Sequence, residues 1–121
     1  MTSILYVEDN DDLREALALL LESEGREVVT CASGEDALAA LAARSFDVLI
    51  TDVSLPGISG TELARSVLAE RPRQRVVLCS GYGANQDLSS LGPNVCWILK
   101  PFEMDALEHL LQRLAVVDAG A

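Results

Sequence analysis

Short apolar runs alternate with longer, more polar stretches along the chain. The runs are rich in Val, Ile and Leu and show no polar alternation: Ile4–Val7, Val28–Cys31, Val48–Ile50, Val76–Cys79 and Val95–Leu99. Uninterrupted short runs of this kind are typical of strands that are buried on both faces of a parallel sheet. The pattern therefore predicts strands at these places.

The stretches between the runs carry apolar residues at the three- and four-residue spacing of amphipathic helices. The predicted stripes are Leu13, Ala16, Leu17, Leu20 and Leu21; Ala37, Leu38, Leu41 and Ala42; Leu63, Ala64, Val67 and Leu68; and Met104, Leu107, Leu111 and Leu114. Gly25 is a predicted C-cap, Ser59 and Glu62 open a predicted capping box, and Pro72 is a predicted helix end. The glycine-rich segment 81–94 predicts only a short helix, at 84–91.

Strands and helices thus alternate along a chain of 121 residues. This order predicts a doubly wound α/β fold, a parallel sheet with helices on both faces. The length predicts a single domain over 1–121, with a core over 3–115 and a flexible tail at 116–121. In such folds, ligands bind at the carboxyl ends of the strands, so the residues that follow each strand are the first candidates for a functional site.

Composition narrows the classes of partner. Half of the residues are hydrophobic, which excludes disorder, and 9 basic against 19 acidic residues give a net charge of −10. This charge argues against nucleic acid or an anionic membrane as a direct partner. The apolar runs are far shorter than the ~20 residues of a membrane span, and no basic signal segment precedes Glu8. We therefore expect a cytoplasmic protein.

Cysteine and histidine restrict the metal chemistry. Cys31, Cys79 and Cys96 form no CxxC pair, and we interpret them as small buried hydrophobes in a reducing compartment. The chain has one histidine, His109, so a metal site with several histidines is excluded. We interpret His109 as an ordinary surface residue. A metal in this chain would therefore be held by oxygen, which favours a hard cation such as Mg²⁺ or Ca²⁺.

Charged and hydroxyl side chains follow four of the predicted strands. The first strand runs into Glu8-Asp9-Asn10-Asp11-Asp12, the third into Asp52, the fourth into Ser80 and the fifth into Lys100, the only lysine of the chain. Asp11 and Asp12 stand where a helix begins, so we interpret them as capping and helix-dipole residues. Glu8, Asp9 and Asp52 are different, because the ends of the first and third strands would bring them together.

Three carboxylates within ~5 Å repel one another by roughly 3 kcal/mol per pair at an effective dielectric constant of ~20. One lysine cannot offset this repulsion, so the site either holds protons or binds a cation, and Mg²⁺ fits best. Without a metal, the acidic loop would repel phosphate, which argues against a nucleotide or flavin site of the glycine-rich kind. With a metal, the residues suit phosphoryl transfer: Asp52 as nucleophile, Lys100 as a countercharge and Ser80 as a hydrogen-bond donor. A turn-capping role for Asp52 beside Pro56 would not explain this convergence.

These residues resemble the receiver domain of bacterial two-component response regulators. The resemblance rests on Glu8-Asp9, Asp52 in DVSLPGISG, Ser80 in SGY and Lys100 in KPF, and it covers 3–115. It implies a flavodoxin-like fold with strand order 2-1-3-4-5. It further implies that Asp52 takes a phosphoryl group from a histidine of a sensor kinase or phosphotransfer protein. Such a domain catalyses its own phosphorylation and dephosphorylation but is no turnover enzyme.

The same resemblance assigns the remaining roles. Mg²⁺ would be ligated by Asp9, Asp52 and the main-chain carbonyl of Ser54, with Glu8 acting through water. Ser80 and Lys100 would hold the phosphoryl oxygens. Ser54 and Tyr82 match positions that tune hydrolysis.

Trp97 stands at the switch position, where the family has Tyr or Phe, and it reads equally well as a half-exposed packing residue. The surface of the fourth and fifth strands would then act on a downstream target or in a homodimer. Two other functions stay open: a haloacid dehalogenase-type aspartyl-phosphate hydrolase, although Ser54 stands where those enzymes carry a second Asp, and a phosphate-independent interaction module.

Overall fold

The structure, a computed structural model, describes residues 2–23, 25–80, 94–99, 105–109 and 111. Within these ranges it holds strands and helices in strict alternation up to β4: β1 (Ser3–Val7), α1 (Asp11–Glu22), β2 (Glu27–Cys31), α2 (Gly34–Ala43), β3 (Val48–Asp52), α3 (Gly60–Glu70), β4 (Arg75–Ser80) and β5 (Val95–Leu99). Residues 105–109 and 111 are helical. The predicted helix at 84–91 and the predicted tail at 116–121 lie outside the described residues.

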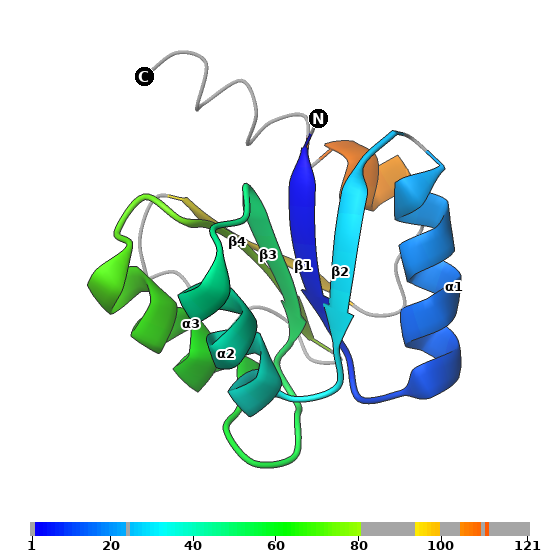
Figure 1. The fold of residues 1–121 in the computed structure, drawn as a ribbon. Helices are drawn as coiled ribbons and strands as arrows, with labels where there is room; N and C mark the ends of the chain where they lie inside the picture. The colour runs from blue at the N-terminus through cyan, green and yellow to red at the C-terminus, as the bar shows by residue number, and fades with distance from the viewer. Residues whose placement is uncertain (1, 24, 81–93, 100–104, 110, 112–121) are drawn as a thin grey trace.

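The strands form one parallel sheet of five strands in the order β2-β1-β3-β4-β5 (Figure 1). Each observed strand contains the apolar run that predicted it, so the predicted fold class and strand order are confirmed. The order also puts β1 and β3, which are separated by β2 and two helices along the chain, side by side in the sheet. This neighbourhood is the feature of the fold that builds the site described below.

Helices cover both faces of the sheet (Figure 1). One core packs alternate strand residues against α1 and the carboxy-terminal helical residues: Ile4, Tyr6, Leu17, Leu21, Val48, Ile50, Val77, Cys79, Ile98, Leu107 and Leu111. The other packs the intervening strand residues against α2 and α3: Leu5, Val7, Ala37, Leu41, Phe46, Leu49, Leu63, Ala64, Val67, Val76 and Leu78. Successive strand residues point to opposite faces, which is why the runs inside the central strands are apolar without alternation.

The strand β2 departs from the predicted burial on both faces. Residues of β1, β3 and β4 are almost all buried, whereas every residue of β2 is exposed or half-buried. The reason is its place at the edge of the sheet, where it pairs with β1 alone among the described strands. An edge strand has one flank in solvent and needs less apolar surface.

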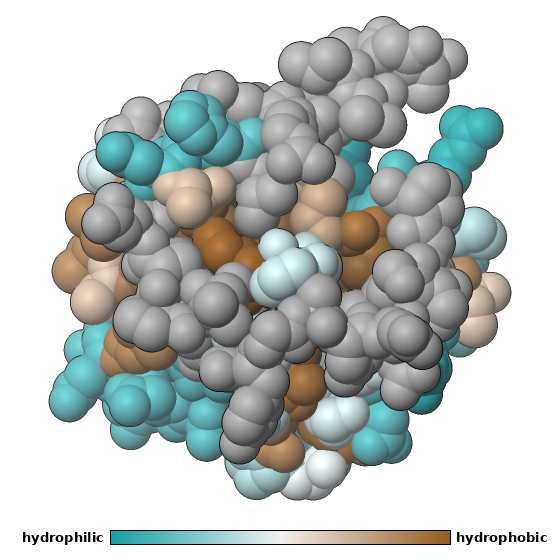
Figure 2. Space-filling view, turned by 180° about the vertical axis from the view of Figure 1, so that it is seen from behind, coloured by the Kyte–Doolittle hydropathy of each residue, from teal (hydrophilic) through white to brown (hydrophobic). Residues whose placement is uncertain are grey.

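Helix α1 is rotated relative to the predicted stripe. The helix buries Leu17, Ala18 and Leu21, while Leu13 and Leu20 are 39 % and 50 % exposed. Leucine occurs on more than one side of this helix, so periodicity alone does not say which side packs on the sheet. Figure 2, which views the molecule from behind, shows hydrophobic side chains along the edge where α1 lies.

The helix ends mostly follow the predicted signals. The Ser59 hydroxyl accepts a hydrogen bond from the N–H of Glu62 at 3.1 Å and opens α3, as predicted. The C-cap of α1 is Ser23 and not Gly25 as predicted; Gly25 follows two residues later with a φ of +79°, and its N–H donates to the carbonyl of Glu22. The capping interpretation of Asp11 and Asp12 is wrong in detail: the cap of α1 is Asn10, whose side-chain oxygen accepts from the N–H of Leu13. Both aspartates lie in the first turn, where they still meet the helix dipole.

His109 is exposed, in agreement with its interpretation as a surface residue. Within the described residues, no helix has the length and apolar character needed to cross a membrane.

Candidate functional site

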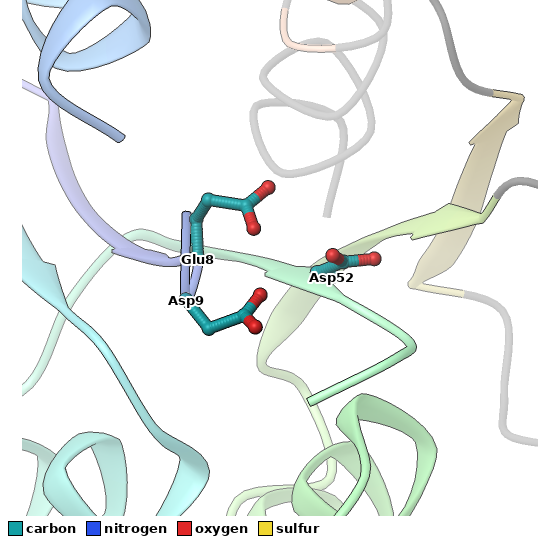
Figure 3. Close-up of side chains that lie close together, drawn as sticks. All are labelled: Glu8, Asp9 and Asp52. Atoms are coloured by element: carbon teal, nitrogen blue, oxygen red, sulfur yellow. The ribbon is translucent and has the colours of Figure 1, made fainter. Parts of the chain in front are cut away.

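Three carboxylates meet at the carboxyl edge of the sheet. Glu8 and Asp9 directly follow β1, and Asp52 is the last residue of β3. The register pairs Tyr6 with Ile50, so Glu8 and Asp52, each two residues further on, end at the same level and on the same face. One oxygen from each of the three carboxylates lies within 4.8 Å of the others (Figure 3). The predicted convergence is therefore confirmed.

The three carboxylates are unequally buried. Glu8 is 2 % and Asp52 7 % exposed, whereas Asp9 is open to solvent. Charges at this separation repel by roughly 3 kcal/mol per pair at an effective dielectric constant of ~20. An all-oxygen donor set with one open side is the kind of site that suits Mg²⁺, which binds through one or two carboxylates and keeps several waters. The residues present thus fit a hard divalent cation.

Three hydrogen bonds hold Glu8. Its N–H donates to the carbonyl of Cys31 at the end of β2, at 3.0 Å. Its carboxylate accepts from the N–H of Asn10 at 3.2 Å, and its main-chain carbonyl accepts from Nη1 of Arg14 at 2.8 Å. The acidic pair thus sits on a turn that is bonded to β2 and to α1.

Hydrogen bonds also hold the main chain around Asp52. The Thr51 hydroxyl donates to the carbonyl of Asp52 at 3.0 Å, and the N–H of Val53 donates to the carbonyl of Cys79 in β4. The N–H of Gly60, at the start of α3, donates to the carbonyl of Val53 at 2.9 Å. Asp52 therefore projects from a backbone that β4 and α3 both support.

A buried phenol lies beneath the carboxylates. Tyr6 precedes Glu8 by two residues on β1, points to the same face and is 2 % exposed. Burial, with the neighbouring Glu8 carboxylate as the next cause, raises the pKa of the Tyr6 phenol far above its ordinary value. The phenol is therefore neutral and adds no further charge to the site. Burial likewise raises the pKa of the Cys31 thiol at the end of β2.

The other predicted site residues are placed as follows. Ser80 is the last residue of β4 and 7 % exposed; it stands one position beyond Cys79, the partner of Asp52 in the sheet. Ser54 lies in the exposed loop after β3. Trp97 of β5 pairs with Leu78 of β4. Its exposure of 40 % suits a packing residue and a switch equally. Lys100 and Tyr82 lie outside the described residues, as does the segment that follows Ser80.

Sequence reasoning missed three residues of this site. Asn10 and Arg14 act through the turn after β1, and Gly60 lies against the backbone of Asp52. A signal for Arg14 was present, since it stands three residues after Asp11 on one helix face and is the only basic residue among the acidic ones of 8–15. Gly60 opens a helix eight residues after Asp52, but nothing local marks it as a contact of that residue.

Comparison with known proteins decides the family. The family model described as response regulator receiver domain matches residues 4–112. The chain belongs to the receiver domain family of response regulators. The sheet order and the acidic cluster at the ends of β1 and β3 are those that the resemblance in the sequence implied.

Similar curated proteins are longer than this receiver domain. It is 36 % identical over 115 residues to the response regulator protein FleR of Pseudomonas aeruginosa, covering 93 % of the chain but 24 % of FleR. It is 35 % identical over 114 residues to the transcriptional regulatory protein TcrA of Mycobacterium tuberculosis, covering 93 % of the chain and 45 % of TcrA. The chain thus spans a quarter to a half of these relatives.

Two similar solved structures have about the same size as this receiver domain. One is the response regulator TrrA of Thermotoga maritima in complex with Mg²⁺ and BeF, with a TM-score of 0.85, 33 % identity, and coverage of 94 % of this chain and 99 % of TrrA. Another is the chemotaxis response regulator CheY4 of Vibrio cholerae, with a TM-score of 0.86, 29 % identity, and coverage of 94 % and 98 %. Both structures are receiver-type response regulators, in agreement with the family model that matches this chain.

Proposed function

We propose that Asp52 is the phosphoacceptor of this receiver domain. A carboxylate oxygen of Asp52 attacks the phosphorus of a phosphohistidine on a partner protein, the new O–P bond forms as the N–P bond breaks, and the imidazole leaves with the N–P electron pair. Hydrolysis of the acyl phosphate then returns the carboxylate and inorganic phosphate. The observation that supports this proposal most is that Glu8, Asp9 and Asp52 lie together at the ends of β1 and β3 in a chain of this family.

The acidic cluster is the proposed Mg²⁺ site. Asp9, Asp52 and the main-chain carbonyl of Ser54 would be direct ligands, and Glu8, 2 % exposed and bonded to the N–H of Asn10, would act through a bound water. When bound, Mg²⁺ would offset the repulsion among the carboxylates and the negative charge of the incoming phosphoryl group. The complex of TrrA with Mg²⁺ and BeF supports this choice of cation.

The residues around the cluster have narrower proposed roles. Ser80, buried at the end of β4 beside the partner of Asp52, would donate a hydrogen bond to a phosphoryl oxygen. Lys100 would form an ion pair with the phosphoryl group. Ser54 and Tyr82 would tune hydrolysis by limiting the access of water, and Trp97 would report the change at the surface of β4 and β5.

The partners follow from the same chemistry. A sensor histidine kinase or a histidine phosphotransfer protein would supply the phosphoryl group, and the altered β4–β5 surface would act on a downstream protein or on a second receiver. The chain would be one domain over 1–121 with its core over 3–115, standing alone or within a longer regulator or hybrid kinase. Its free cysteines suit a reducing compartment, and we propose that it acts in the cytoplasm.

The test is phosphorylation with a small donor. Incubation with acetyl phosphate and Mg²⁺ should add the mass of one phosphoryl group, and trapping followed by peptide mapping should place it on Asp52. Asp52→Asn should stay unmodified, while Asp12→Asn, which removes an exposed charge in the first turn of α1, should be modified like the wild type. Removal of Mg²⁺ with EDTA should abolish the reaction.

Two outcomes would contradict the proposal. The first is a folded wild-type protein that stays unmodified under these conditions and also with a phosphorylated histidine phosphotransfer protein as donor. The second is a phosphoryl group that maps to another residue and persists in Asp52→Asn.

A further inference from the structure

Arg14 reaches from α1 back to the end of β1. Its Nη1 donates to the main-chain carbonyl of Glu8 at 2.8 Å, and its Nη2 donates to the Asp11 carboxylate at 2.6 Å. The Arg14 side chain is 18 % exposed, whereas that of Asp11 is 78 % exposed. Because the two bonds use two nitrogens of a planar group, the guanidinium is fixed in orientation as well as in position.

The carbonyl that Arg14 binds belongs to the peptide unit between Glu8 and Asp9. The plane of this unit sets the direction in which the chain leaves β1 and therefore the direction of the Asp9 side chain. The preceding peptide unit is held separately, because the N–H of Glu8 donates to the carbonyl of Cys31. The Arg14 contact thus helps to fix the step from the buried carboxylate of Glu8 to the exposed one of Asp9. Figure 3 shows these two carboxylates beside Asp52.

The charge of Arg14 and its geometry act on a divalent cation in opposite directions. The positive charge of Arg14, which is bonded to the turn that carries two of the carboxylates, repels a divalent cation bound there. Hydrogen bonds that orient the ligands strengthen cation binding, and their loss costs about 10- to 100-fold in affinity at known metal sites. Whether the cation affinity falls or rises when Arg14 is replaced therefore tells which effect dominates.

We propose that Arg14 is a positioning residue of the cation site, acting through the Glu8–Asp9 peptide unit. The geometry favours the orienting effect over the repulsive one, because the mostly buried Arg14 side chain joins the Glu8 carbonyl, in the turn that carries two of the three carboxylates, to Asp11 at the start of α1. This inference rests on the proposed function only in taking Mg²⁺ as the cation.

The test is a Mg²⁺ titration followed through the backbone amide signals of the site residues in NMR spectra. Arg14→Met removes the charge and both donors, and Arg14→Lys keeps the charge but loses the planar fork. Both should bind Mg²⁺ about 10-fold more weakly than the wild type. Arg65→Met, which removes an exposed arginine of α3, should bind Mg²⁺ like the wild type. If one Arg14 variant fails to fold, the other carries the comparison.

The outcomes separate this inference from the proposed function. If the wild type binds Mg²⁺ and the folded Arg14 variants bind it as tightly or more tightly, Arg14 acts only through charge or stability and the inference is overturned. A wild type that binds no Mg²⁺ overturns the proposed cation site, and this inference with it. A loss of thermal stability without a loss of Mg²⁺ affinity also contradicts the positioning role.

Discussion

The α-carbon of Gly60 faces the main-chain carbonyl of Asp52. A β-carbon at position 60 would overlap the carbonyl oxygen of Asp52 and lie 2.8 Å from its carbonyl carbon. The obstacle is backbone and not the end of a flexible side chain, so a larger residue has to displace either α3 or the end of β3. The first residue of α3 is therefore part of what sets the position of the candidate phosphoacceptor.

Replacement of Gly60 should change both stability and phosphorylation. Gly60→Ala should lower the free energy of unfolding by about 2 kcal/mol or more, because the overlap with Asp52 cannot relax locally. Because the displaced backbone carries Asp52, phosphorylation by acetyl phosphate should also slow markedly. Gly25→Ala is the matched control: its φ of +79° makes alanine costly by about 1 kcal/mol, but no atom lies within 4 Å of the new methyl group. Urea unfolding and phosphorylation rates together check the pair, and a Gly60→Ala protein with normal rates would refute the contact.

Removal of one carboxylate should stabilise the metal-free protein. In EDTA, Asp52→Asn should raise the free energy of unfolding by about 1 kcal/mol or more, since it removes one charge from a cluster with oxygens within 4.8 Å. Glu70→Gln, at the distant end of α3, should have little effect. Denaturant unfolding in EDTA checks both, and equal stabilities of Asp52→Asn and wild type would contradict the repulsion.

Addition of Mg²⁺ should reverse that order. The cation stabilises the form that binds it, by about 2.7 kcal/mol at a concentration 100 times the dissociation constant, so the wild type should gain and Asp52→Asn should gain much less. Thermal unfolding with and without MgCl2 measures the gain. A similar gain in both proteins would mean that Asp52 is no ligand.

The ion pair between Arg26 and Glu108 should make the free energy of unfolding depend on pH in the acidic range. Arg26, before β2, binds Glu108 of the carboxy-terminal helical residues through two bonds of 2.7 and 2.6 Å. The hydrogen bond from Arg26 lowers the pKa of Glu108 below its ordinary value of 4.5. The Glu108 carboxyl thus binds a proton less tightly in the folded state than in the unfolded state. The ion pair therefore stabilises the folded state fully above pH 4.5, and this stabilisation is lost as the pH falls through the lowered pKa.

Glu108→Gln tests this pair. It should cost about 1 kcal/mol at pH 7, and the difference from the wild type should shrink as the pH is lowered below 4.5. Glu27→Gln serves as the control, because the Glu27–Arg44 pair is far more exposed and should contribute little. Urea unfolding across this pH range measures both differences, and a difference for Glu108→Gln that does not vary with pH would contradict the ion pair.

Trp97 should report on the occupied site. It is the one tryptophan of the chain and lies on β5, paired with Leu78, two residues before Ser80. If it acts as a switch, Mg²⁺ with beryllium fluoride should change its fluorescence in the wild type and not in Asp52→Asn. An unchanged signal, with binding shown by NMR, would leave Trp97 as a packing residue of β5.

Much of the fold could be predicted from the sequence because burial on both faces gives each central strand an uninterrupted apolar run. The runs at Ile4–Val7 and Val76–Cys79 are local signals of this kind, and the strands contain them. Local signals also placed Ser59 at the start of α3. They failed for α1, where leucines occur on several sides: the predicted stripe contained Leu20, whereas the structure buries Ala18.

The sequence by itself determined which chemical groups stand at the strand ends: carboxylates at 8, 9 and 52 and a hydroxyl at 80. Only the tertiary structure decided that these carboxylates approach within 4.8 Å, because that depends on β1 and β3 being neighbours in the sheet. It alone also brought Arg14 onto the Glu8 carbonyl and Gly60 onto the Asp52 backbone. A strand shows its burial in its own residues, but a contact between a helix start and a strand end depends on how the whole chain packs, and no local pattern of residues records it.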